Sequence, residues 1–94
     1  MDQFEVTGEV ELFPQTGGWH YVLIPAWISD ELSHFADRGL IPIRAKVGST
    51  RWDTSLLPKG DGRHFVALNA KVRKANDIDI EDQVTVQFEV RSHR

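Results

Sequence analysis

Two stretches of the sequence hold the residue types best suited to catalysis or ligand binding. In the first, His20 lies in an otherwise apolar run, between the aromatic residues Trp19 and Tyr21. Because imidazole titrates near neutral pH, His20 could act as a proton donor or a ligand contact in a pocket. The alternative is a structural histidine that is hydrogen-bonded within the fold, as most buried polar groups are. The sequence leaves both interpretations open.

The second stretch, residues 51–55, combines hydrogen-bond donors, an acceptor and a large aromatic side chain. Side chains along a β-strand alternate between faces, so Trp52 should lie on the face opposite to Arg51 and Ser55. Trp52 is then either core material or the wall of a pocket, because aromatic residues serve both roles. We expect a small ligand or a peptide to bind at Trp19, His20, Arg51, Trp52 and Ser55.

The sequence also contains the residue types of a hydrolytic triad, in Ser55, His20 and Asp53. A triad is defined by its geometry, however, and these residue types are common enough to occur together by chance. Ser55 also lacks the G-x-S-x-G pattern of a nucleophile elbow. We therefore predict no catalytic residue, and an enzyme that uses His20 with a carboxylate is the third of three functional hypotheses.

No pattern in the sequence is typical of a metal or cofactor site. The chain has no cysteine, which excludes disulfides, thiolate metal sites and a cysteine nucleophile. His34, His64 and His93 lack the spacing of metal ligands, and the glycines form neither of the two common phosphate-binding motifs. We expect neither a metal nor a cofactor.

The charges of the chain are unevenly distributed. The net charge of −3 makes nucleic acid an unlikely general partner, because such binding depends on cations that displace counterions from the phosphates. Residues 44–74 nevertheless contain eight Lys or Arg and two Asp. Within them Lys71, Arg73 and Lys74 lie on a predicted short helix, where they could contact an anion or a partner, or form a solvated face.

The N-terminus lacks the basic start and apolar run of a signal peptide, and no apolar stretch approaches the roughly 20 residues that span a bilayer. The expected location is the cytoplasm, and the expected state is a monomer or a homodimer.

Alternating apolar and polar residues predict the elements that position these side chains. Six strands are expected, at residues 4–12, 19–24, 41–47, 50–57, 63–67 and 83–91. Gly48-Ser49 fits a two-residue turn that requires glycine first, which predicts a hairpin. Six strands in a short chain favour a small antiparallel or mixed β-barrel, since closure removes exposed strand edges. One domain should span residues 1–94, with Ser92–Arg94 as a loose tail.

Two short helices complete the predicted elements. Ser29 is expected to cap a helix whose first turn holds Asp30 and Glu31, and Gly39 is expected to stop that helix. Asn69 should cap the second helix, over Ala70–Ala75.

The arrangement resembles a bacterial family, the domain of unknown function 1905, over nearly the whole chain. The residues that carry the resemblance are Gly18-Trp19-His20, Leu23-Ile24-Pro25, Trp52-Asp53-Thr54-Ser55-Leu56, Leu68-Asn69-Ala70, Val72-Arg73-Lys74-Ala75 and Ile80-Glu81-Asp82-Gln83-Val84-Thr85-Val86. The resemblance implies a six-stranded β-barrel and no established activity. Where the family usually has Gly-Asp before its last strand, this chain has Glu81-Asp82. If the glycine of the family serves to allow a positive φ, the turn should be rearranged or mildly strained here.

The leading functional hypothesis is a non-catalytic binding module that accepts a small molecule or peptide near Trp19, His20, Arg51 and Trp52. The alternative is a dimeric regulatory domain that contacts nucleic acid or a protein through a local basic face. That face would comprise Arg44, Lys46, Lys71, Arg73 and Lys74.

Overall fold

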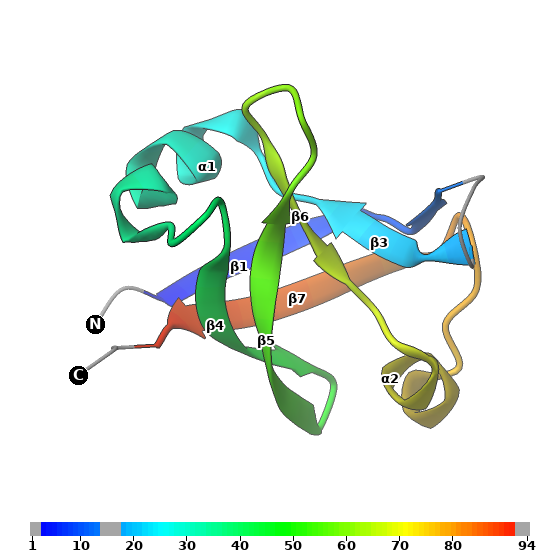
Figure 1. Ribbon diagram of the computed structural model, residues 1–94. Coiled ribbons are helices and arrows are strands. Elements are labelled where there is room, and N and C mark those ends of the chain that lie inside the picture. The colour runs from blue at the N-terminus through cyan, green and yellow to red at the C-terminus, as the bar shows by residue number, and fades with distance from the viewer. Residues whose placement is uncertain (1–2, 14–17, 92–94) are drawn as a thin grey trace.

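The computed structural model describes residues 3–13 and 18–91, and over these residues the fold is mainly β. Its seven strands form one antiparallel sheet in the order β1-β7-β4-β5-β6-β3-β2, which curls into a nearly closed barrel (Figure 1). The strands are β1 (Gln3–Glu9), β2 (Glu11–Leu12), β3 (His20–Leu23), β4 (Ile41–Val47), β5 (Thr50–Pro58), β6 (His64–Ala67) and β7 (Gln83–Val90). The predicted β-barrel is therefore confirmed, whereas the predicted tail, Ser92–Arg94, lies outside the described residues.

The seventh strand arises because the first predicted strand breaks at Val10. Before the break, β1 pairs with β7, and after it β2 pairs with β3, at the other end of the strand order. The backbone of Val10 bonds to neither strand. Its N–H donates to the carbonyl of Asp82, and its carbonyl accepts from the N–H of Glu81, both over 2.9 Å. One bent segment thus contributes to both ends of the sheet, which brings the barrel close to closure.

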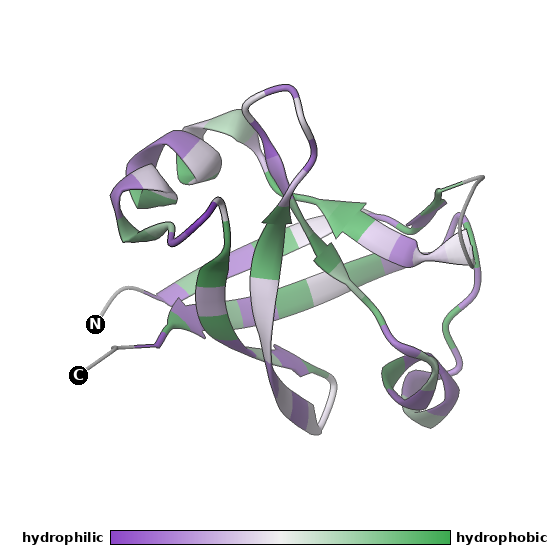
Figure 2. Ribbon diagram, viewed as in Figure 1, coloured by the Kyte–Doolittle hydropathy of each residue, from purple (hydrophilic) through white to green (hydrophobic). Residues whose placement is uncertain are grey.

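The barrel interior is filled by the apolar side chains that alternate along the strands. Figure 2 shows hydrophobic and hydrophilic bands alternating along the strand ribbons. Side chains with no solvent exposure come from strands and helix alike, and include Val22, Leu32, Ile43, Leu56 and Val86. Burial of such side chains is the main favourable term in folding, so the period-two pattern both forms the strands and stabilises the barrel.

The hairpin between β4 and β5 forms at Gly48-Ser49, as predicted. Val47 pairs with Thr50, and Gly48 has a φ of 59°, which suits a turn with glycine first. A side chain at position 48 would also collide with the side-chain oxygen of Asn76. The Asn76 amide donates to the Thr50 hydroxyl over 3.1 Å. The hairpin tip and the end of the second helix are therefore packed together.

The first helix, α1 (Ala26–Leu32), starts earlier than predicted. Pro25 occupies the N-cap position, so the predicted cap at Ser29 is wrong, as is the placement of Asp30 and Glu31 in the first turn. Ser29 is a buried residue in the middle of α1, and its hydroxyl accepts a hydrogen bond from the backbone N–H of His64 over 3.1 Å. Ser29 thus accepts a hydrogen bond from strand β6 and not from the N-terminus of its own helix. Local sequence cannot predict such a contact between distant segments.

The predicted helix stop at Gly39 is also wrong. Helix α1 ends at Leu32 and continues as a single 3-10 turn, η2 (Ser33–Phe35). Gly39 instead lies in a tight turn in which Asp37 and Leu40 exchange two backbone hydrogen bonds. Its φ of 83° explains the glycine.

The second helix, α2 (Ala70–Asn76), is capped as predicted. The Asn69 side chain accepts a hydrogen bond from the backbone N–H of Val72 over 2.9 Å. Helices α1 and α2 lie at opposite ends of the barrel (Figure 1). No helix in the described ranges is long and apolar enough to cross a membrane.

The turn before β7 has the strained geometry that the replacement of glycine by Glu81 predicted. The N–H of Asp82 donates to the carbonyl of Asp79 over 3.1 Å, and Glu81, the third residue of this turn, has a φ of 77°. A type II turn requires a positive φ at this position and therefore favours glycine. Glu81 thus adopts a backbone conformation that costs L-residues energy.

Candidate functional site

The predicted site residues lie on two strands that are not neighbours. Arg51, Trp52 and Ser55 are on β5, whereas His20 begins β3 and Trp19 precedes it. Strand β6 lies between β3 and β5 in the sheet. Trp52 is partly buried and packs against the core, while Trp19 is 50% exposed. The structure therefore does not gather the five residues into one site, since Arg51 and Ser55 share the outer face of β5 and Trp52 packs against the core.

The outer face of four neighbouring strands forms a shallow, open depression of about 480 Å³. Its lining includes one predicted site residue, Arg51. The strand registers place Glu5, Gln87, Lys46 and Arg51 in one row across β1, β7, β4 and β5. The sequence missed this site because rows across a sheet depend on strand order, which periodicity does not report.

The row of Lys46 and Arg51 places two cations directly opposite each other. Like charges in such a cross-strand pair repel each other. Within the described part of the chain, neither side chain has a carboxylate partner. At the other end of the row, Gln87 donates to Glu5 over 3.1 Å. The depression is therefore basic at the β4–β5 side and acidic at the β1 side.

The adjacent row holds a compensated charge pair. Arg44 donates through Nε to Asp53 Oδ1 over 3.0 Å, and Arg91 lies 3.8 Å from the other oxygen of this carboxylate. The hydrogen bond from Arg44 lowers the pKa of Asp53 below its ordinary value. Arg44 is already paired with Asp53. Among the described residues that line the depression, Lys46 and Arg51 are therefore the cations that could pair with an anionic ligand.

Asp53 and Ser55 do not form a triad with His20. Both lie on β5, and the carboxylate of Asp53 binds arginines. Among the described residues, no hydrogen bond joins the side chain of His20 to either of them. His20 Nδ1 is buried without a hydrogen-bond partner there, so the hydrogen bond expected of a structural histidine is not seen at this atom.

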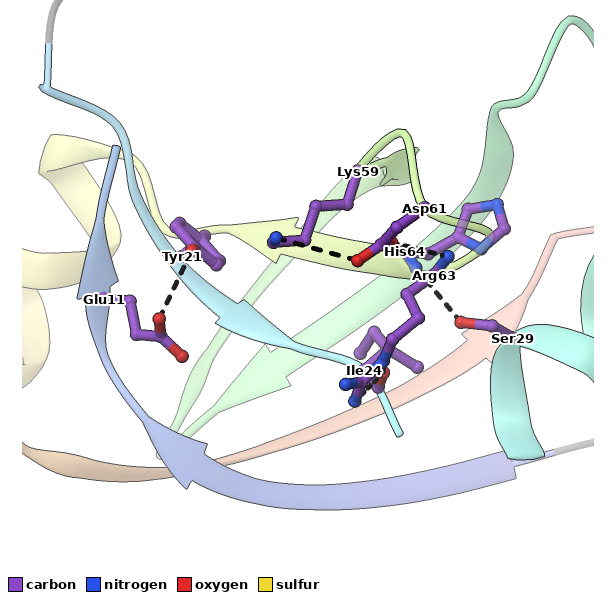
Figure 3. Close-up of polar contacts among 8 residues, drawn as sticks. All are labelled: Glu11, Tyr21, Ile24, Ser29, Lys59, Asp61, Arg63 and His64. Atoms are coloured by element: carbon purple, nitrogen blue, oxygen red, sulfur yellow. Dashed lines mark hydrogen bonds and ion pairs between the residues drawn. The ribbon is translucent and has the colours of Figure 1, made fainter. Parts of the chain in front are cut away.

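Polar groups also meet where β3 and β6 reach α1, as Figure 3 shows. The guanidinium of Arg63 donates to the carbonyl of Ile24 through two nitrogens, over 3.0 and 3.3 Å. The backbone of His64 accepts from the Ile24 N–H and donates to Ser29. These hydrogen bonds hold β6 against the end of β3 and against α1. They therefore explain the position of α1 and do not point to a catalytic role for these residues.

Tyr21 is the one tyrosine in the sequence and follows His20 on β3. Its hydroxyl donates to Glu11 over 3.3 Å (Figure 3). Burial raises the pKa of Tyr21 above 10.0, and the nearby Glu11 charge and hydrogen bond raise it further. The raised pKa keeps the Tyr21 hydroxyl protonated at neutral pH, so it can donate this hydrogen bond.

The three predicted cations of α2 have different environments. Arg73 is partly buried and donates through Nε to the carbonyl of Leu68 over 3.0 Å, which ties the helix to the segment between β6 and α2. Lys71 and Lys74 are exposed. In the described ranges, no group of three His, Asp or Glu side chains could hold a metal ion.

Residues 7–88 match the family model described as "Domain of unknown function (DUF1905)". No curated protein matches the chain. The match covers β2 to β6, α1, α2, most of β7 and the C-terminal end of β1.

Proposed function

Because the chain belongs to the family described as domain of unknown function DUF1905, whose description gives no activity, we propose its function from the surface of the barrel. The protein is a non-catalytic binding module whose ligand carries a carboxylate or phosphate group. The ligand binds in the depression on the outer face of β1, β7, β4 and β5. Lys46 and Arg51 contact its anionic group.

The observation that carries this proposal is the opposed pair of Lys46 and Arg51 without a carboxylate partner in the described chain. An anion placed between the two cations would replace their repulsion by attraction to both. Charge-assisted hydrogen bonds of this type are among the stronger ones, and arginine can bind a carboxylate or phosphate through two parallel bonds. The depression of about 480 Å³ has the volume of a small-ligand site.

The alternative, a basic face that contacts nucleic acid, has less support. It relies on five cations, of which Arg44 pairs with Asp53 and Arg73 bonds to the backbone. Lys71 lies on α2 and not on the two strands that carry Lys46 and Arg51. Glu5 and Glu89 also line the depression and would repel a phosphate backbone.

The proposal can be tested by NMR titration of the protein with phosphate, citrate and a short acidic peptide, at low salt where electrostatic attraction is greatest. We expect amide shifts at β4 and β5. Replacing Lys46 or Arg51 by Gln should weaken binding about tenfold or more, since a hydrogen bond to a charged group contributes roughly 1.5–3 kcal/mol.

Lys71→Gln is the matched control, because it removes an equal charge from an exposed helix position. If the amide shifts caused by the anions are unchanged in Lys46→Gln and Arg51→Gln, the proposal is contradicted. Binding that Lys71→Gln weakens equally would show general attraction and not a site. Binding of duplex DNA at low salt, lost in Lys71→Gln, would favour the basic-face alternative.

A further inference from the structure

Among the described residues, the first half of β5 pairs with another strand on one side only, with Asn76 of α2 in contact at Thr50. Strand β4 covers it along its length, from Thr50 to Leu56. On the other side, β6 pairs only with Leu57 and Pro58, at the far end of β5. Beyond that point β6 continues against β3. The barrel therefore has an open strand edge along residues 51–55.

The register shows which backbone groups face this edge. In a two-residue hairpin, the residues that flank the turn are hydrogen-bonded to each other, and the bonding then alternates along the strands. Val47 and Thr50 flank the turn, so even-numbered residues of β5 bond to β4. Odd-numbered residues point away from β4. The N–H of Lys59 donates to Arg63 across the β5–β6 connection over 2.8 Å, which agrees with this alternation.

The backbone groups of Arg51, Asp53 and Ser55 consequently face the open edge. In the described ranges, no strand other than β4 pairs with these three residues. Arg51 and Asp53 are exposed, and Ser55 is partly exposed. A row of unpaired N–H and C=O groups is a template on which another chain can add a strand.

We propose that β5 binds an extended peptide as an additional antiparallel strand. The inference rests on the proposed function, because an acidic residue of the peptide binds Arg51, a cation of the proposed anion site, from the free side of β5. It also names the partner class, a peptide segment and not a free metabolite. Antiparallel addition continues the pairing of every strand in this sheet and is slightly more stable per residue than parallel pairing.

Charge complementarity specifies the peptide. Residues directly opposite each other share a face of the sheet, so the peptide residue opposite Arg51 should be acidic and the one opposite Asp53 should be basic. In an antiparallel pair, the basic residue precedes the acidic one by two positions. The residue between them lies opposite Trp52, which packs against the core, and should be apolar. The expected motif is basic–apolar–acidic.

The test uses four synthetic peptides. The first is acetyl-Thr-Val-Lys-Val-Glu-Thr-amide, and the second has Lys and Glu exchanged. We expect the first to bind at least about tenfold more tightly, since exchange places like charges opposite each other. In the third, N-methyl groups on Lys and Glu remove the two N–H groups that should bond to β5. A peptide N-methylated on the central Val is the matched control, because that N–H points away from β5.

The protein side has its own matched pair, Ser55→Pro and Ser55→Ala. Proline removes a donor that faces the edge and leaves the bonds to β4 intact, whereas alanine keeps the donor. Peptide binding should be lost in Ser55→Pro and retained in Ser55→Ala, with circular dichroism confirming that both variants fold.

The outcomes separate the inference from the proposed function. If phosphate and citrate bind but N-methylation of Lys and Glu has no effect, strand addition is wrong and the anion site stands. If neither the small anions nor the peptide binds, both proposals fail. Self-association that Ser55→Pro abolishes, without peptide binding, would assign the edge to a second copy of the chain and overturn the peptide proposal.

Discussion

Replacing Glu81 by glycine should stabilise the protein. Glu81 adopts a φ of 77°, and a left-handed backbone costs an L-residue roughly 1–2 kcal/mol. Glycine avoids that cost, but it also raises the conformational entropy of the unfolded protein. This entropy offsets about 0.4–1 kcal/mol of the gain in stability. The net gain should be roughly 0.5–1 kcal/mol. For a domain of this size, thermal unfolding should then shift upward by roughly 3–6 °C.

Two features of the structure make Glu81 a clean position for this measurement. Its side chain is exposed and makes no hydrogen bond or ion pair with another described residue. Its backbone N–H, which bonds to Val10, is retained in glycine. The substitution therefore changes the backbone preference and the charge, and little else.

The charge effect needs a control, because Asp79 and Asp82 belong to the same acidic turn. Glu81→Gln removes the charge and keeps the backbone strain. Urea unfolding should be measured for the unsubstituted protein and both variants. The free energy of unfolding of Glu81→Gly should exceed that of Glu81→Gln by most of the expected gain. If Glu81→Gly is no more stable than Glu81→Gln, the assignment of strain to this turn is refuted.

Three further predictions concern single contacts. Gly48→Ala should destabilise the protein by more than about 1 kcal/mol in urea unfolding, because its φ is positive and Asn76 fills the space; equal stability would show that the hairpin tip can rearrange. Asn69→Ala should cost about 1 kcal/mol through loss of the helix cap, whereas Asn69→Ser should restore most of it. Absorbance at 295 nm should show Tyr21 ionising above pH 10.0, with Glu11→Gln lowering the midpoint. Since the folded pKa is raised, the Tyr21 contribution to stability is present below pH 10 and is lost as the pH rises through the folded pKa; an unshifted midpoint in the folded protein would contradict the burial of this hydroxyl.

Of the proposed binding surface, the sequence indicated Arg51 and, as part of a basic face, Lys46, but not Glu5 and Gln87. Arg51 was singled out by the residue types around it, and it lines the depression. Lys46 lies on the other strand of a hairpin that was predicted, so their pairing follows from the Gly48-Ser49 turn. Glu5 and Gln87 come from strands that join only through long-range pairing. No local pattern could place them beside Lys46.

Local sequence alone determined which residues become strands and which side of each strand faces the core. Alternation predicted the strands, Gly48 predicted the hairpin and Asn69 predicted the helix cap, whereas the strained turn at Glu81 was expected from the family resemblance. Each of these depends on contacts between residues close in sequence or on the conformational range of one residue, and such preferences can be read directly.

Tertiary structure decided how the strands are joined and where the sheet stays open. The break at Val10 depends on hydrogen bonds to Glu81 and Asp82, and the position of α1 depends on the bond from His64 to Ser29. The open edge of β5 exists because β6 leaves it after two pairs. Alternation along a strand reports which face is buried but carries no information on which strand lies beside it, so only the folded chain reveals these contacts.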